Sequence, residues 1–150
     1  MLGLPGSGKT QFSKELQKKL NITRLSLDEE YFKIVGNSQQ ELRDFKLESE
    51  IEERLKLQIV ELLKNGESII LDYCPWKKKD RDFFKKYIED NGGVWKMFYL
   101  KTPKEVLINR LNKRNSYKHP EHQFVTPTML EDFYRRFDEP NGEGEEIVAS

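Results

Sequence analysis

Three shortages limit what this sequence of 150 residues can encode. It has a single cysteine, Cys74, which rules out an internal disulfide framework and favours a reducing compartment. No apolar run approaches the roughly 18 residues that a membrane-spanning helix needs. Neither charge sign is in excess, because Lys plus Arg and Asp plus Glu each number 26, so no overall field attracts nucleic acid or an anionic membrane. We therefore expect a cytoplasmic protein without a membrane partner.

The chain also lacks repeats and low-complexity tracts. Charged residues make up 35% of the sequence, but they are spread along amphipathic segments and do not indicate disorder. A chain of this length can bury about two-thirds of its unfolded surface around one core. We expect a single domain over residues 1–150.

What the sequence does contain is a phosphate-binding motif at its start. Residues Gly3–Thr10 match the pattern G-x-x-x-x-G-K-[ST] at every fixed position. Glycines let the backbone bend tightly and bring its N–H groups onto phosphate oxygens, and the following helix directs its positive end at the same anion. Lys9 would neutralise the β- and γ-phosphates, and Thr10 would offer its hydroxyl to magnesium. The predicted nucleotide-binding residues of this loop are Pro5, Gly6, Ser7, Gly8, Lys9 and Thr10.

A glycine-rich turn before a helix can also be simple punctuation, so the helix that must follow is the test of this interpretation. Apolar residues recur at one-turn spacing as far as Leu20, which predicts that helix. Only two residues precede Gly3, whereas a central strand has about five. We expect either an unusually short middle strand or a sequence that begins inside a longer chain.

Apolar and amphipathic segments alternate along the rest of the chain. The segments that read as strands are residues 22–27, 68–71, 94–100 and 146–148. Helices are predicted up to residue 20 and over residues 39–65, which form one helix or two, 78–91, 103–113 and 127–137. This alternation predicts an α/β fold with a parallel sheet covered on both faces, which binds ligands at the carboxyl ends of its strands.

Asp28 and Asp72 each follow an apolar segment, so both are expected on the edge of the sheet that carries the phosphate loop. Asp28 is a candidate general base that accepts a proton from a substrate hydroxyl as it attacks the γ-phosphate. Asp72 is a candidate magnesium residue, acting directly or through Thr10. Either carboxylate could instead cap the next helix.

Arg110 and Arg114 lie four residues apart on one predicted helix and lead into the polar segment 115–125. This arrangement is typical of a lid, here around residues 110–126, whose closure brings guanidinium groups to the transferring phosphoryl group. Arg110 is the candidate for binding nucleotide phosphate, and Arg114 for catalysis. A solvated arginine face remains the alternative.

Other polar clusters carry weaker signals. The basic run 77–81 could hold an anionic acceptor, although a solvated helix start is the favoured reading. Tyr73 and Trp76 could floor an acceptor pocket or belong to the core. His119 and His122 stand three residues apart without a further ligand cluster, so a metal site there is disfavoured. Cys74 has no neighbouring base in the sequence and is expected to be inert.

These residues resemble the P-loop kinases related to the polynucleotide kinase domain, chloramphenicol phosphotransferase and the zeta toxins. The likeness spans nearly the whole chain and includes Trp76 and Arg81 after Asp72 and the segment 137–143. It implies a three-layer P-loop NTPase fold with five parallel strands in the order 2-3-1-4-5, the first truncated here. By motif match, the family's base falls on Asp28 and its lid arginines on Arg110 and Arg114.

The predicted function is an ATP-dependent kinase that transfers the γ-phosphate to a hydroxyl of an unidentified small molecule, with magnesium as cofactor. ATP is preferred over GTP by family likeness. Tyr31 stands where polynucleotide kinases tend to carry an arginine, which argues against a nucleic-acid acceptor. Two alternatives remain open, a nucleotide-dependent switch or assembly ATPase and a nucleic-acid 5′-hydroxyl kinase.

Overall fold

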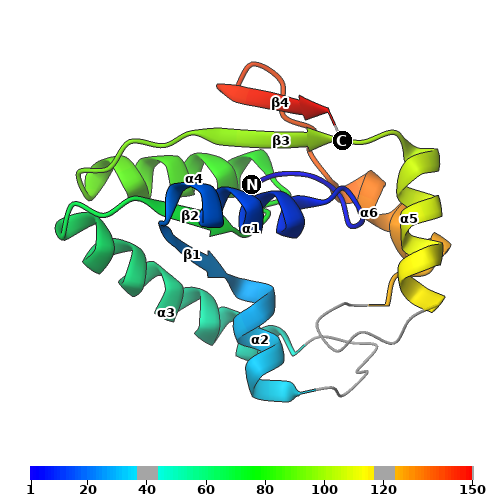
Figure 1. Ribbon diagram of the computed structural model, residues 1–150, viewed down its shortest axis with the longest axis horizontal. Coiled ribbons are helices and arrows are strands. Elements are labelled where there is room, and N and C mark those ends of the chain that lie inside the picture. The colour runs from blue at the N-terminus through cyan, green and yellow to red at the C-terminus, as the bar shows by residue number, and fades with distance from the viewer. Residues whose placement is uncertain (37–43, 117–123, 150) are drawn as a thin grey trace.

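The computed structural model describes residues 1–36, 44–116 and 124–149 of the chain (Figure 1). Strands and helices alternate over these residues. In chain order they are α1 (Lys9–Leu20), β1 (Thr23–Ser26), α2 (Leu27–Val35), α3 (Phe45–Lys64), β2 (Ile69–Asp72), α4 (Lys78–Asp90), β3 (Met97–Lys101), α5 (Lys104–Ser116), α6 (Pro127–Arg136) and β4 (Glu145–Ala149).

The strands pair in parallel, as the alternation of segments predicts. β1 pairs with β2, and β3 pairs with β4, so that two two-stranded sheets result. Leu2 forms an isolated parallel bridge with Tyr99, and the Met1 ammonium group donates a hydrogen bond to the Leu71 carbonyl at 3.0 Å. The first residues of the chain therefore contact both strand pairs, and Figure 1 shows the pairs on either side of the N-terminus.

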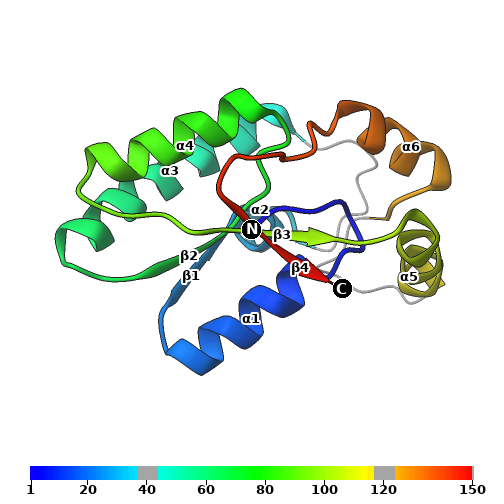
Figure 2. The ribbon, with the colours of Figure 1, turned by 90° about the horizontal axis from the view of Figure 1, so that it is seen from above.

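Helices cover both faces of the strands. Figure 2 shows α3 and α4 on one side and α1 on the other. The predicted apolar stripe of the long helix is confirmed, because Ile51, Leu55 and Ile59 of α3 are buried in one cluster with residues of β1, α2 and α4. On the opposite face, Phe12 of α1 meets Phe98 edge to face, with ring centroids 5.5 Å apart.

A second apolar cluster lies at the carboxyl ends of the strands. Leu4 of the phosphate loop is buried there with residues of α5 and α6, so the loop rests on these two helices. The other buried members of the cluster are Leu107, Leu111, Val125, Leu130 and Phe133. None of the helices in the described ranges is long and apolar enough to cross a bilayer.

Several helix boundaries follow the predicted signals. The Thr126 side chain accepts a hydrogen bond from the Met129 N–H at 3.1 Å and caps α6. At the end of α3, Gly66 has φ of +72° and donates to the Leu63 carbonyl, while Glu67 donates to Leu62. These two bonds form the Schellman motif in which a left-handed glycine closes a helix.

Side-chain caps mark the starts of α2 and α3, and Leu27 lies in a helix rather than in the predicted strand 22–27. α2 begins at Leu27, because the Ser26 side chain accepts a hydrogen bond from the Glu29 N–H and caps a first turn rich in acidic residues. α3 begins at Phe45, within the segment 39–65 predicted as one helix or two, and the Asp44 side chain accepts hydrogen bonds from two N–H groups of its first turn. Residues 39–43 of the predicted helix lie outside the described ranges.

A buried ion pair fixes the segment before β4. The Arg81 side chain is only 1% exposed and binds both carboxylate oxygens of Glu143, at 2.8 and 2.5 Å. It also donates to the carbonyls of Pro75 and Trp76. The basic run 77–81 is therefore not a uniformly solvated helix start, because its last residue holds two distant segments together.

Candidate functional site

The phosphate loop has the backbone that its glycines permit. Gly3 has φ of +144°, and a Cβ added there would lie 2.5 Å from Ser7 Oγ and 2.9 Å from the Leu100 carbonyl oxygen. Gly8 has φ of +91° and directly precedes α1. Both positions combine left-handed backbone with either close approach or a helix start, so side chains there would strain the loop.

Lys9 folds back into this loop. Its Nζ donates hydrogen bonds to the carbonyl oxygens of Gly3 at 2.7 Å and Leu4 at 3.2 Å. Because Gly8 has no side chain to cap α1, and no acidic residue lies in the first turn, the N–H groups there are left for a bound anion. An ammonium group and a helix N-terminus thus converge on one concave backbone, which suits a polyphosphate.

Three more side chains lie in the loop or reach its backbone. Ser7 is fully buried, and its hydroxyl has no hydrogen-bond partner in the part of the chain that the structure describes. Arg110 of α5 is exposed and reaches the Gly6 and Ser7 carbonyls at 3.5 Å from its Nη1. The Cys74 thiol donates to the Gly3 carbonyl at 3.4 Å, so the same carbonyl receives Lys9 and Cys74.

Asp72 is the last residue of β2 and is buried. Its Oδ2 lies 2.7 Å from Ser13 Oγ and accepts hydrogen bonds from the Arg24 side chain, while Oδ1 takes none from the described residues. The next helix is α4, whose N-cap is Lys77, so Asp72 does not cap it. The exposed hydroxyl-bearing residue Thr10 follows Lys9 at the start of α1.

These donors suit magnesium better than a metal that needs a protein cage. No group of three or more His, Cys, Asp or Glu side chains gathers over the described residues. Magnesium in phosphate sites takes most of its ligands from phosphates and water and only one or two from side chains. A hydroxyl at Thr10 and the Oδ1 atom of Asp72 fit that pattern.

Asp28 and Arg114 come from different elements but interact. Asp28 is exposed in the first turn of α2, and the cap of that helix is Ser26 rather than Asp28. Arg114 lies in the last turn of α5. Burial lowers the pKa of the Arg114 guanidinium, and the Asp28 carboxylate is close enough to oppose that shift. The carboxylate of α2 and the guanidinium of α5 are therefore near enough for the charge of one to act on the pKa of the other.

Three residues that sequence reasoning missed join α1, β1 and α2. Arg24 of β1 donates from Nε to Ser13 Oγ at 2.9 Å and binds both oxygens of Glu29 at 2.8 Å. The hydrogen bond from Arg24 lowers the pKa of Glu29 to about 2. A signal was available, since Arg24 is a cation inside an apolar strand and must find acidic partners when buried.

The aromatic candidates for an acceptor pocket are largely packed against other rings. Trp76 meets Phe133 of α6 edge to face at 4.8 Å, and Tyr73 meets Phe84 of α4 at 5.4 Å. The Tyr73 hydroxyl donates to Glu52 at 3.1 Å. The predicted pair His119 and His122 lies outside the described residues.

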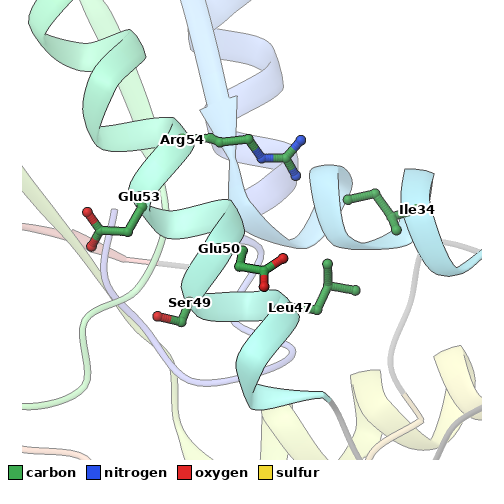
Figure 3. Close-up of a pocket in the computed structure, with 6 residues that line it drawn as sticks. All are labelled: Ile34, Leu47, Ser49, Glu50, Glu53 and Arg54. Atoms are coloured by element: carbon green, nitrogen blue, oxygen red, sulfur yellow. The ribbon is translucent and has the colours of Figure 1, made fainter.

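A separate hollow of about 530 Å³ lies between α2 and α3 (Figure 3). In Figure 3, Leu47, Glu50 and Arg54 extend from α3 toward the side on which Ile34 of α2 lies, whereas Ser49 and Glu53 point away from it. None of these residues is a predicted nucleotide or catalytic residue.

Comparison with known proteins places this geometry in context. A family model described as an AAA domain matches residues 1–140. No curated protein is similar enough in sequence to count as a match.

Solved structures resemble the chain over nearly all of its length. A candidate kinase from Chloroflexus aurantiacus is 23% identical with a TM-score of 0.75, covering 99% of this chain and 84% of that one. A gluconokinase from Sinorhizobium meliloti is 17% identical with a TM-score of 0.67, covering 99% and 79%. The APS kinase of Mycobacterium tuberculosis, solved with AMPPNP and APS, is 16% identical with a TM-score of 0.64, covering 99% and 84%. At these identities the likeness establishes the fold alone.

Proposed function

This chain belongs to the AAA-domain family and has the fold of small P-loop kinases, and we propose that it is an ATP-dependent kinase that phosphorylates a hydroxyl of a small molecule. The observation that carries the proposal is the complete phosphate loop, in which the Lys9 ammonium group contacts the Gly3 and Leu4 carbonyls beside the uncapped start of α1. The charge interaction of Asp28 with Arg114 of α5 supports it. A nucleotide switch needs the loop, but it does not need a general base for an acceptor hydroxyl, the role that we propose for Asp28.

The proposed reaction divides its tasks among few residues. The acceptor hydroxyl gives its proton to the Asp28 carboxylate while its oxygen attacks the γ-phosphorus, and the bond to the β-phosphate oxygen breaks to release ADP. Lys9 and Arg110 bind the phosphates. Arg114 offsets the negative charge that spreads over the transferring group. A magnesium ion, when bound, would neutralise the β- and γ-oxygens, and Thr10 and Asp72 are the residues that would hold it.

The proposal includes a single domain with a lid around residues 110–126. It also includes one five-stranded sheet in the order 2-3-1-4-5, in which strand 1 is formed by the first residues of the chain and strands 2 to 5 are β1 to β4. In that sheet the first residues form the middle strand. The Leu2 bridge to Tyr99 and the Met1 bond to Leu71 support this reading, because they link the first residues to β3 and β2. The middle of the lid, residues 117–123, lies outside the described ranges.

A small-molecule acceptor is preferred over a nucleic acid. Structures that share the fold are named as kinases of a sugar, of gluconate and of APS. Tyr31, at the position where polynucleotide kinases tend to carry an arginine, is 3% exposed, and its hydroxyl accepts a hydrogen bond from the Asp44 N–H. A buried phenol offers no positive charge to the backbone phosphates of a nucleic acid, as an arginine at this position would.

The test is phosphate transfer from ATP labelled at the γ-position. The acceptors are sugars, sugar acids, nucleosides, hydroxylated antibiotics and a 5′-hydroxyl oligonucleotide, each assayed with and without magnesium. We expect magnesium-dependent labelling of at least one small molecule. Labelling of the oligonucleotide alone would make the chain a nucleic-acid kinase. ATP consumption that no hydroxyl compound stimulates, with nucleotide-dependent capture of a partner, would make it a switch or assembly ATPase.

A further inference from the structure

Arg24 is the centre of a buried polar cluster that sequence reasoning did not find. Its side chain is 4% exposed, although it lies on β1, which pairs with β2 on one side. Its Nε lies 3.1 Å from Asp72 Oδ2 and 2.9 Å from Ser13 Oγ, and its Nη1 and Nη2 each lie 2.8 Å from one oxygen of Glu29. A buried guanidinium with partners on every nitrogen is held in one orientation.

Two of the partners, Ser13 and Glu29, belong to the helices that carry the phosphate-loop lysine and the proposed base, and the third, Asp72, ends β2. Ser13 lies on α1, one turn after the lysine of the phosphate loop, and its hydroxyl is 2.9 Å from the Thr10 carbonyl. Glu29 lies on α2 and directly follows Asp28, the proposed base. Lys14 of α1 also reaches Glu29 at 3.0 Å. The phosphate-loop helix and the helix of the proposed base are therefore joined through side chains that touch neither reacting atom.

The charges of the cluster balance, since the cations Arg24 and Lys14 face the anions Asp72 and Glu29. The Arg24 and Asp72 side chains are 4% and 6% exposed, and a shift of α1 breaks the hydrogen bonds of Ser13 unless Arg24 follows. A shift of Arg24 in turn moves the two-point contact with Glu29. Movement at the phosphate loop thus has a rigid path to the first turn of α2.

We propose that Arg24 is a positioning residue that couples occupation of the phosphate loop to the position of α2, and thereby sets Asp28 for proton abstraction. The inference rests on the proposed function for its consequence, because it assigns Arg24 to the same site. Glu29 is the link on the α2 side of this coupling, and Ser13 is the link on the α1 side. The planar two-point contact requires arginine, because lysine can present only a single point charge to Glu29.

The chain offers a matched pair of variants on α2. Glu29→Gln removes the charge that binds Arg24 and keeps the size of the side chain. Glu30→Gln makes the same chemical change one residue later, at a carboxylate that pairs with Lys33 on the same helix. Both variants lose one charge in the first turn of α2, so any helix-dipole effect is the same in the two.

The experiment measures amide hydrogen exchange over residues 27–35 with and without magnesium and AMPPNP, together with calorimetric AMPPNP affinity. In the wild type we expect AMPPNP to slow exchange in α2 at least about threefold, as ordering of a coupled helix requires. Glu29→Gln should keep the affinity within about threefold and lose the slowing, as expected for a link that touches no ligand. Glu30→Gln should behave as the wild type.

The remaining outcomes of this experiment would overturn the proposed coupling. Equal slowing in the wild type and Glu29→Gln overturns the coupling, as does a wild type that binds AMPPNP without any change in α2. A wild type that does not bind AMPPNP overturns the proposed function as well as the coupling. Binding without a change in α2 overturns only the coupling, so the two failures are distinguished. If Glu29→Gln does not fold by circular dichroism, Glu29→Asp replaces it, since a shorter carboxylate keeps the charge and loses the two-point contact. Preserved slowing in Glu29→Asp likewise overturns the inference.

Discussion

Arg24 and Arg81 both have buried side chains, but they join different parts of the molecule. Each side chain is at most 4% exposed, and each binds both oxygens of a glutamate. The remaining partners of Arg81 are the Pro75 and Trp76 carbonyls, so it joins α4 to the segment before β4. The partners of Arg24 lie instead beside the phosphate loop and the proposed base. The same kind of ion pair therefore stabilises the fold around Arg81 and the proposed site around Arg24.

The difference shows that burial of a charge does not by itself indicate function. A buried ion pair contributes little net stability, but removing one partner leaves an uncompensated charge. What separates the two arginines is the elements that they join. Variants in the two regions should therefore separate loss of activity from loss of stability.

The largest effect is expected at the loop itself. Lys9→Ala removes the ammonium group that meets the β- and γ-phosphates, so phosphate transfer should fall to background while the fold persists. The assay is labelled ATP with an acceptor found in the panel, and circular dichroism monitors the fold. Lys14→Ala is the control from the same helix, and its transfer should remain measurable. Transfer by Lys9→Ala at the wild-type rate would remove the loop from the reaction.

Next comes the comparison of Arg81→Met with Arg24→Met. Arg81→Met leaves Glu143, whose side chain is 5% exposed, without its main partner, which should lower the free energy of unfolding by about 3–5 kcal/mol. Arg24→Met should also destabilise the chain, because it removes the cation from Asp72, whose side chain is 6% exposed, although Glu29 keeps Lys14. Urea unfolding measures both.

The activities, rather than the stabilities, should separate the two arginines. Folded Arg81→Met, assayed below its melting temperature, should keep its rate of phosphate transfer, whereas Arg24→Met should lose rate with nucleotide affinity largely retained. If Arg81→Met instead lost its rate of phosphate transfer and Arg24→Met kept it, Arg24 would have only a structural role and Arg81 would act on the site.

Asp28→Asn tests the proposed base with little cost to the fold, because Asp28 is exposed. The amide cannot accept the proton, so we expect transfer to fall at least about a hundredfold. AMPPNP binding by calorimetry should be unchanged. Equal transfer rates in the wild type and the variant would take Asp28 out of the base role.

The smallest effect is a dependence of stability on acid pH. The pKa of Glu29 falls from 4.5 to about 2 in the folded chain, because it accepts hydrogen bonds from Arg24 and Lys14. The folded state therefore binds fewer protons than the unfolded state, and the stabilisation is complete above pH 4.5 and lost as the pH falls toward 2. After screening by solvent we expect about 1–2 kcal/mol.

Chemical unfolding between pH 5 and pH 2 measures this contribution. Glu29→Gln should flatten the decline by that amount, and Glu30→Gln should leave it in place. A decline that is equally steep in Glu29→Gln and in the wild type would show that Arg24 does not hold Glu29 as a carboxylate.

The phosphate loop and the alternation of helices and strands could be predicted because their signals are local. Residues Gly3–Thr10 form one contiguous motif, and Thr126 and Gly66 mark helix ends next to the turns that they close. The apolar stripe of α3 is likewise read from spacing within one helix.

The buried networks could not be predicted, since their members are far apart in the chain. Arg24 and Asp72 are separated by 48 positions, and Arg81 and Glu143 by 62, so no periodicity connects them. The helix that begins at Leu27 could not be predicted for a local reason. The apolar run 22–27 extends through the Ser26 cap, and a cap is recognised only once the strand is known to end there.

The thiol of Cys74 gives the protein a reporter of its own. It donates to the carbonyl of Gly3, which Lys9 also contacts, and the sequence has no second cysteine. A fluorophore attached by maleimide chemistry would thus occupy one known position beside the loop. When Lys9 turns from that carbonyl toward a phosphate, the surroundings of the dye change, and a titration with ATP can be followed by its emission without any acceptor in the cuvette.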